Sequence, residues 1–211
     1  MRLAQTAGSV AGFFHTGGLA GSLMNNAVVA RSYATGAVSG PSFLRGLVGD
    51  VNTGASVVSS FWDTQTTGQG TSAGGAGAVG RTTAQMQQLA TFTAAGWAID
   101  DAGGTGTSWR IYEGHTAPLL RHFFTAPLTA TAASGSKPFD GTAATSLAVT
   151  YTPVAPDARL LGTASVVADD TAPGTHTARV TGIYSAQHGY DIARVAGTIT
   201  ITPLAPVTAA I

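Results

Sequence analysis

The chain has 211 residues, enough for one or two domains, and only 9% of them are charged, whereas a typical soluble domain has about 25%. Its formal net charge is zero and it contains a single lysine, so it lacks the clustered cations that a nucleic-acid groove or a polybasic membrane surface needs. Without cysteine it can form neither disulfides nor thiolate sites for catalysis or metal binding.

Near the N-terminus, residues 17–36 show the same pattern as residues 45–64 after a shift of 28 positions. Both stretches combine small apolar residues with glycine, and almost no charge interrupts them. A period of this length is typical of solenoids, in which successive coils stack and strands pair between coils. The shift superposes Leu19 on Leu47, Val29 on Val57, and Tyr33 on Phe61.

We therefore predict an all-β fold that begins with a short β-solenoid over residues 1–80. The superposed residues should form columns of the core, with neighbouring coils about 4.8 Å apart. Gly21 and Gly49 should occupy equivalent corners, because glycine adopts backbone angles that other residues avoid.

A glycine-rich stretch, residues 69–80, is interpreted as a flexible connection. Its end, Gly75 to Gly80, matches the pattern G-x-G-x-x-G, but no buried strand leads into it and no βαβ unit surrounds it. A phosphate loop would also need a lysine ahead of a helix. We therefore expect no cofactor at this loop.

The next segment, residues 81–92, is predicted to be a helix capped by Thr82 or Thr83. Its apolar face would carry Met86, Leu89 and Ala90. Two short strands around Trp97 and Trp109 follow. We predict that residues 81–124 cap the solenoid, since an open coil end is a row of unpaired strand edges.

From residue 126 onward, alternating Thr, Val and Ile residues replace the glycine-rich pattern. This alternation predicts a small β-sandwich-like or β-grasp-like module over residues 126–205, with turns at Asp140-Gly141, Asp169-Asp170 and His188-Gly189. The chain's end echoes the start of this module, so residues 206–211 are expected to begin a truncated next module. Pro127 is expected to mark a boundary between two separate cores.

Several of these runs resemble a known family. "SYATGAVSG", "RGLVG" and the run "SSFWDTQTTGQGTSAGGAGAVGRTTAQMQQLATFTAAGW" resemble the GLUG-repeat region of filamentous-haemagglutinin-like bacterial surface adhesins. "WRIYEGHTAPLL" resembles the segment that follows such repeats, and "LTATAASGSKPFDGTAA" resembles the start of a YDG-type or MBG-type β module, with Phe139 where that motif has tyrosine. "GYDI" and "GTITITP" resemble the end of such a module.

The resemblance implies a non-enzymatic segment of a secreted adhesin passenger, displayed on the bacterial cell surface and exported through an outer-membrane two-partner transporter. Host-cell or biofilm glycans, or surface proteins, are the implied partners. The chain itself shows neither the apolar stretch of a signal peptide nor a run long enough to span a bilayer, so it is expected to be a fragment of a larger parent.

Candidate reactive residues are few. The histidines lack the spacing that places two metal ligands on one helical face, and each aspartate pair is better interpreted as part of a turn. Glu113, the only glutamate, lies between Tyr112 and His115, and a structural role is favoured there too. The histidines are His15, His115, His122, His176 and His188, and the aspartate pairs are Asp100-Asp101 and Asp169-Asp170.

The three tryptophans, Trp62, Trp97 and Trp109, are expected in the core, with a sugar-stacking platform as the less favoured interpretation. We accordingly expect no catalytic, cofactor-binding or metal-binding residue. One alternative is a carbohydrate-active β-helix enzyme, a lyase or hydrolase, although residues 1–80 offer only Asp50 and Asp63 as acids. Another is a truncated reading frame without separate activity.

Overall fold

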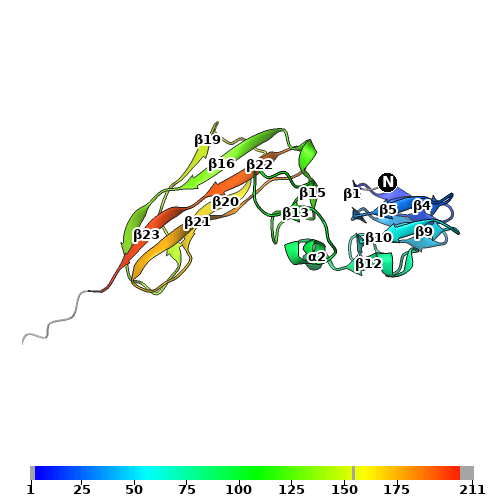
Figure 1. The fold of residues 1–211 in the computed structure, drawn as a ribbon, viewed down its shortest axis with the longest axis horizontal. Helices are drawn as coiled ribbons and strands as arrows, with labels where there is room; N and C mark the ends of the chain where they lie inside the picture. Colours follow the sequence, from blue (N-terminus) through cyan, green and yellow to red (C-terminus); the bar gives the residue numbers. More distant parts are fainter. Residues whose placement is uncertain (1–2, 154, 205–211) are drawn as a thin grey trace, which may run out of the picture. The chain divides into compact units, whose positions relative to one another are not determined.

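The computed structural model describes residues 3–153 and 155–204, and these are mostly β-strand with a few short helices (Figure 1). The predicted all-β class is therefore confirmed. The chain divides into two compact units. The first comprises the described residues up to Ile99 together with Glu113–Pro118, and the second comprises Asp100–Tyr112 and the described residues from Leu119 onward. Residues 206–211, expected to begin a further module, lie outside the described residues.

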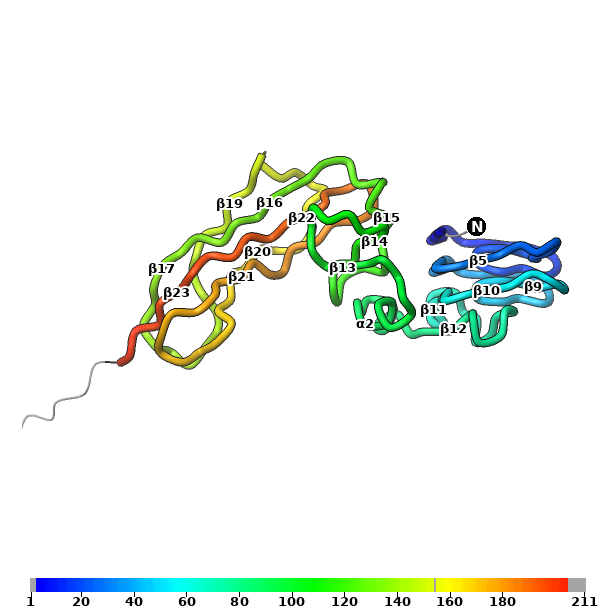
Figure 2. The backbone as a smooth tube through the Cα atoms, viewed as in Figure 1, coloured from blue at the N-terminus to red at the C-terminus, as the bar shows by residue number. Residues whose placement is uncertain are grey.

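The first unit is built from short parallel strand pairs with one constant offset. Ala4 pairs with Ser32 and Val29 pairs with Val57, so each strand of a first repeat (residues 4–31) lies beside the strand 28 positions later, in a second repeat (residues 32–59). Figure 2 shows these turns of chain running side by side in the blue and cyan part. The pairs are β1 (Ala4–Thr6) with β6 (Ser32–Ala34), β2 (Val10–Ala11) with β7 (Val38–Ser39), β3 (Thr16–Gly17) with β8 (Leu44–Arg45), β4 (Ala20–Leu23) with β9 (Val48–Val51), and β5 (Val28–Ala30) with β10 (Ser56–Val58).

Side chains predicted to stack are neighbours across these pairs. Val29 pairs with Val57 and Tyr33 with Phe61, and all four are buried, as the repeat predicts. Leu19 donates its N–H to the carbonyl oxygen of Leu47 at 2.8 Å, but only Leu47 is fully buried. The difference has a physical reason: residues 71–73 bond to the chain on either side of Leu47 and cover it, whereas Leu19 lies in the outer repeat.

The glycine-rich stretch 69–80 is packed, in contrast to the flexible connection expected from sequence. The backbone oxygen of Gln69 accepts from the indole N–H of Trp62 at 2.8 Å, and Ala73 donates to the carbonyl of Val48 at 3.0 Å. A single turn, η1 (Gly75–Gly77), leads into β12 (Ala78–Arg81), which pairs in parallel with β11 (Ser60–Asp63). Ser60 pairs with Ala78, an offset of 18 rather than 28, so this third turn of chain is shorter than a repeat.

The predicted helix is two short helices, α1 (Thr83–Met86) and α2 (Leu89–Thr93). Thr82 caps α1 in a reciprocal capping box with Gln85, as the sequence predicts. The break follows because the carboxylate of Glu113 accepts a 2.6 Å hydrogen bond from the N–H of Leu89 and so starts a second helix there. The buried side chains are therefore Met86 and Phe92, while Ala90, expected on the apolar face, is exposed.

An aromatic group completes the first unit. Trp97 packs within 4.9 Å of Phe92 and 5.8 Å of Phe61, measured between ring centroids, and its indole N–H donates to the carbonyl of Ser59 at 2.8 Å. The hydroxyl of Tyr33 lies within hydrogen-bonding distance of the side-chain oxygen of Gln5 and of the carbonyl oxygen of Pro118, and burial raises the pKa of this phenol. These contacts hold the helices and residues 113–118 against the repeats.

Two sheets around one core form most of the second unit. A five-stranded sheet has the order β17-β23-β21-β20-β18, and a three-stranded sheet has the order β19-β16-β22. Alternating side chains such as Leu128, Val180, Ile192 and Ile199 point into the shared core. The strands are β16 (Ala126–Ala132), β17 (Gly135–Pro138), β18 (Ala144–Thr145), β19 (Val149–Thr152), β20 (Leu161–Ala168), β21 (Gly174–Tyr184), β22 (Tyr190–Val195) and β23 (Gly197–Thr202).

A smaller sheet precedes them in the chain. It has the order β13-β14-β15, with β13 (Ile99–Asp100), β14 (Trp109–Arg110) and β15 (Leu119–Leu120), and η2 (Arg121–Phe123) follows it. From sequence, residues 81–124 are predicted to cap the first unit. In the structure, residues 100–112 and 119–124 pack with the second unit instead.

Side chains of residues 100–112 bond directly to β22, which explains this boundary. The hydroxyl of Tyr112 accepts from the N–H of Ile192 at 3.2 Å and donates to the carbonyl of Tyr190 at 2.6 Å. Arg110 donates to the carbonyl of Ile192 at 3.2 Å. Two side chains therefore satisfy backbone groups of β22 that a neighbouring strand would otherwise bind.

Candidate functional site

The histidines that the sequence singles out lie in different surroundings. His115 is exposed in the first unit, and one ring nitrogen of His176 lies 2.7 Å from the carbonyl oxygen of Ala172 in the second. Among residues 3–153 and 155–204, no three His, Asp or Glu side chains gather as potential metal ligands. No helix in this described part is long and apolar enough to cross a bilayer.

Turn and cap contacts account for the acids closest to the repeats. Asp63 is buried, and its carboxylate accepts from the backbone N–H groups of Gln65 and Thr66 and from the hydroxyl of Thr83. Glu113 begins α2, as described above. Both carboxylates therefore hold backbone N–H groups in place, Asp63 those of the next turn and Glu113 that of Leu89.

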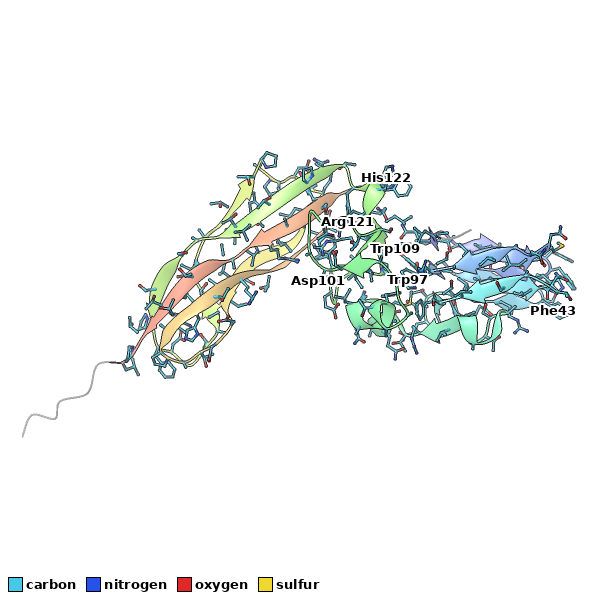
Figure 3. All side chains as sticks on the ribbon, in the orientation of Figure 1. Phe43, Trp97, Asp101, Trp109, Arg121 and His122 are labelled. Carbon is cyan, nitrogen blue, oxygen red and sulfur yellow. The ribbon has the colours of Figure 1, made fainter. Side chains whose placement is uncertain are left out.

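A charged group in the second unit is also structural. Arg121, marked in Figure 3, donates to both carboxylate oxygens of Asp191 at 2.7 and 2.8 Å and to Asp100 at 2.7 Å. Burial lowers the pKa of the nearby Arg110 guanidinium and raises the pKa of the Tyr112 phenol beneath it. These groups bind one another and the backbone of β22, so they form a clamp.

All three tryptophans are buried, as the core interpretation expects. Trp62 and Trp97 are each 5% exposed, and Trp109 is fully buried. None of them can act as an open platform for a ligand. The less favoured sugar-stacking interpretation of these residues is therefore removed by their burial.

Two exposed rings and one partly buried ring lie instead at one corner of the two repeats, which we call the aromatic corner and define as Phe14, His15 and Phe43. The centroid of Phe14 lies 4.2 Å from that of His15 and 4.7 Å from that of Phe43, both edge to face. His15 and Phe43 are stacked at 5.3 Å with 19° between their planes. Phe14 remains 58% exposed and Phe43 54%.

The repeat itself creates this cluster. Phe43 stands 28 positions after His15, so the two occupy the same corner of successive repeats, and their backbone φ angles are 52° and 46°. This left-handed region is uncommon for residues other than glycine, and for a bulky residue it marks a position that the surrounding structure must hold. Figure 3 shows Phe43 at the surface of the first unit, well away from the buried Trp97.

Another exposed ring lies in the second unit. Phe123 is 48% exposed, and its centroid is 6.0 Å from that of His122 and 5.9 Å from that of His188, both edge to face. These rings touch only at their edges, without the stacked pair of the aromatic corner. Phe123 is thus a matched surface residue for comparison.

Sequence reasoning missed the aromatic corner, although the signal was present. The expected sugar-binding rings were the tryptophans, whereas Phe14 and Phe43 belong to short segments, "GFFHTG" and "GPSFLRG", that align at the 28-residue shift.

Comparison with family models, with curated proteins and with solved structures finds no match to this chain. The residues and their geometry therefore carry the functional argument.

Proposed function

We propose that this chain is a non-enzymatic segment of a bacterial surface adhesin of the filamentous-haemagglutinin-like class. In this proposal the first unit is a short β-solenoid of GLUG-type repeats closed by residues 69–97, and the second is a YDG-type or MBG-type β module. The segment would be exported as part of a larger passenger through an outer-membrane transporter and would act on the cell surface in adhesion or spacing.

One observation supports a role in recognition. The parallel register of the two repeats places rings at the same corner, where Phe14 and Phe43 are more than half exposed in a stretch with almost no charge. Large apolar groups gathered at a protein surface mark interaction sites more often than isolated ones. Several acids and bases of the described residues, by contrast, are engaged in caps, turns and the Arg121 clamp, among them Glu113, Asp63 and Asp100.

The test measures retention and turnover on the same purified protein. We expect the chain to be retained on epithelial-cell or glycan-coated surfaces, and to release no fragments from a panel of plant and bacterial polysaccharides. Cleavage of any polysaccharide would contradict the proposal and favour the β-helix enzyme. Absence of both retention and cleavage would contradict it in favour of a truncated product without separate activity.

A further inference from the structure

We propose that the aromatic corner binds the apolar face of a neutral hexopyranose sugar. This inference rests on the proposed recognition function and names its site and its class of ligand. Phe43 and Phe14 would supply the stacking surface, and His15 would hold Phe43 in place and offer its ring nitrogens to the rim of the sugar.

The match begins with shape. A pyranose ring presents C–H groups on its faces and hydroxyls around its rim, so it gains by laying one face on an exposed aromatic ring while its hydroxyls stay in water or bond to the protein. The aromatic corner offers such rings on the surface, since Phe14 is 58% and Phe43 54% exposed. They are also ordered: each lies within 4.7 Å of another ring of the cluster, which reduces the entropy lost on binding.

Charge selects among sugars. Between Gly12 and Arg45 the sequence has two charged residues. The backbone of Arg31 lies at a different corner and donates to the carbonyl of Val58, and the guanidinium of Arg45 already donates to the hydroxyl of Thr71 at 2.6 Å. A sialic acid carboxylate, a sulfate or a phosphate would need a cation close by, and a cationic ligand would need a carboxylate. A stretch so poor in charge suits a neutral sugar.

The surroundings supply polar groups for the rim. The chain neighbours of the rings include the hydroxyl-bearing Thr16 and Ser42 as well as the apolar Phe13 and Leu44, and the hydroxyl of Ser42 donates weakly to the carbonyl of Phe13 at 3.4 Å. The imidazole of His15 carries one donor and one acceptor nitrogen when neutral. A sugar hydroxyl can pair with either, which a wholly apolar partner could not.

Size argues against a protein partner at this corner. A stable protein interface buries about 800 Å² on each side, with a rim of many polar residues around a broad apolar centre. The aromatic corner is a cluster of three rings, and its chain neighbours include the exposed Phe13 as well as Ser42. Its extent fits one or two sugar units, so dimerisation through these rings becomes an outcome of the test.

The experiment screens the full chain on an array of neutral, sialylated and sulfated glycans, then measures the affinity for the best neutral glycan. Phe43→Asn removes a ring while asparagine tolerates the same left-handed backbone, and Phe14→Ala removes the other. Each should weaken binding by about tenfold or more, the range of one aromatic stacking contact. Phe123→Ala, an exposed ring of the second unit, should leave the affinity unchanged.

Failure of this inference can be told from failure of the proposed function. Retention on cells that is equal in wild type and Phe43→Asn would overturn the sugar site and leave the recognition role intact. Binding confined to acidic glycans and abolished by salt would overturn it too, as would a wild-type dimer that Phe43→Asn converts to monomer. No binding to any glycan or cell surface would contradict both proposals.

Discussion

Phe43 and His15 illustrate how a repeat can hold bulky residues in a backbone conformation that they seldom adopt. An isolated phenylalanine in the left-handed region is strained, at a cost on the order of 1–3 kcal/mol. Here the flanking strands β3 and β8 pair in register, Thr16 with Leu44, so both corners are fixed by the same ladder. Strand pairing next to the corner thus offsets the conformational strain of these two residues, while their rings remain at the surface.

Asp140 makes a pH-dependent contact through its side chain. The ammonium group of Lys137 bonds to its carboxylate at 2.8 Å and lowers the pKa of Asp140 to about 2, helped by the N–H of Thr142. A lowered pKa stabilises the folded state fully above the ordinary pKa of about 3.9, and this contribution is lost as the pH falls toward 2.

We therefore expect a carboxyl NMR titration to place the midpoint of Asp140 near pH 2, and Lys137→Met to raise it toward the ordinary aspartate value. Asp157 serves as an internal control, because Arg159 lowers its pKa to about 2 independently of Lys137. An Asp140 midpoint that Lys137→Met leaves in place would refute this account of the turn.

Trp97 is expected to be a large contributor to the stability of the first unit. Its ring is 5% exposed and contacts Phe61 and Phe92, so Trp97→Ala should destabilise this unit by about 3–5 kcal/mol. Hydrogen exchange at the amides of β5 and β10 should accelerate accordingly, while exchange in β21 stays unchanged. Equal acceleration in both units would mean that the ring stabilises a core common to the whole chain.

At the scale of elements, the loop between β13 and β14 approaches β22 closely. A Cβ atom added at Gly103 would lie 2.3 Å from the backbone nitrogen of Ala193, a distance that real side chains do not reach. At Gly106, in the same loop, an added Cβ would meet nothing within 4 Å. Substituting each glycine by alanine therefore distinguishes the effect of close packing, at Gly103, from the effect of reduced loop flexibility, at Gly106.

Gly103→Ala should accordingly destabilise the second unit by about 1–3 kcal/mol through overpacking, and Gly106→Ala should leave its stability nearly unchanged. Denaturant unfolding followed by the dispersion of β22 and β23 amide signals measures both. If the two variants unfold at the same denaturant concentration, the contact between this loop and β22 has no energetic weight.

The sequence predicts the elements that a local pattern encodes. The 28-residue shift predicts the pairs Val29 with Val57 and Tyr33 with Phe61, because stacking makes equivalent positions neighbours. Thr82 follows from capping chemistry in the same way. The packed state of residues 69–80 could not be predicted, since it depends on tertiary hydrogen bonds such as that from Trp62, and glycine-rich sequence looks the same whether packed or free.

Long-range contacts explain the remaining differences. The break after Met86 depends on Glu113, 24 positions beyond Leu89, and the assignment of residues 100–112 depends on side chains that reach β22 some 80 positions later. The candidate site is likewise predictable from sequence only in part. That Phe43 shares a corner with His15 can be read from the repeat, but its exposure and left-handed backbone come from the folded structure.

At the scale of the whole molecule, the chain passes between its two units three times, at residues 99–100, 112–113 and 118–119. A single boundary near Pro127, expected from composition, therefore does not separate them. The second unit takes Tyr112 and Leu119 into its core, and its clamp joins Arg121 to Asp191. Both features begin before the change in composition at residue 126.

These contacts make a prediction about fragments. A fragment of residues 100–204 should fold, because it keeps the Tyr112 hydroxyl on β22 and the ion pairs of Arg121. A fragment of residues 126–204 should not, because it loses those groups and exposes backbone N–H and carbonyl groups of β22, which favours pairing with a second chain. Amide dispersion in NMR spectra and size-exclusion chromatography distinguish the two. A monomeric, fully dispersed fragment of residues 126–204, with a melting temperature equal to that of the longer one, would show that the preceding segment is dispensable.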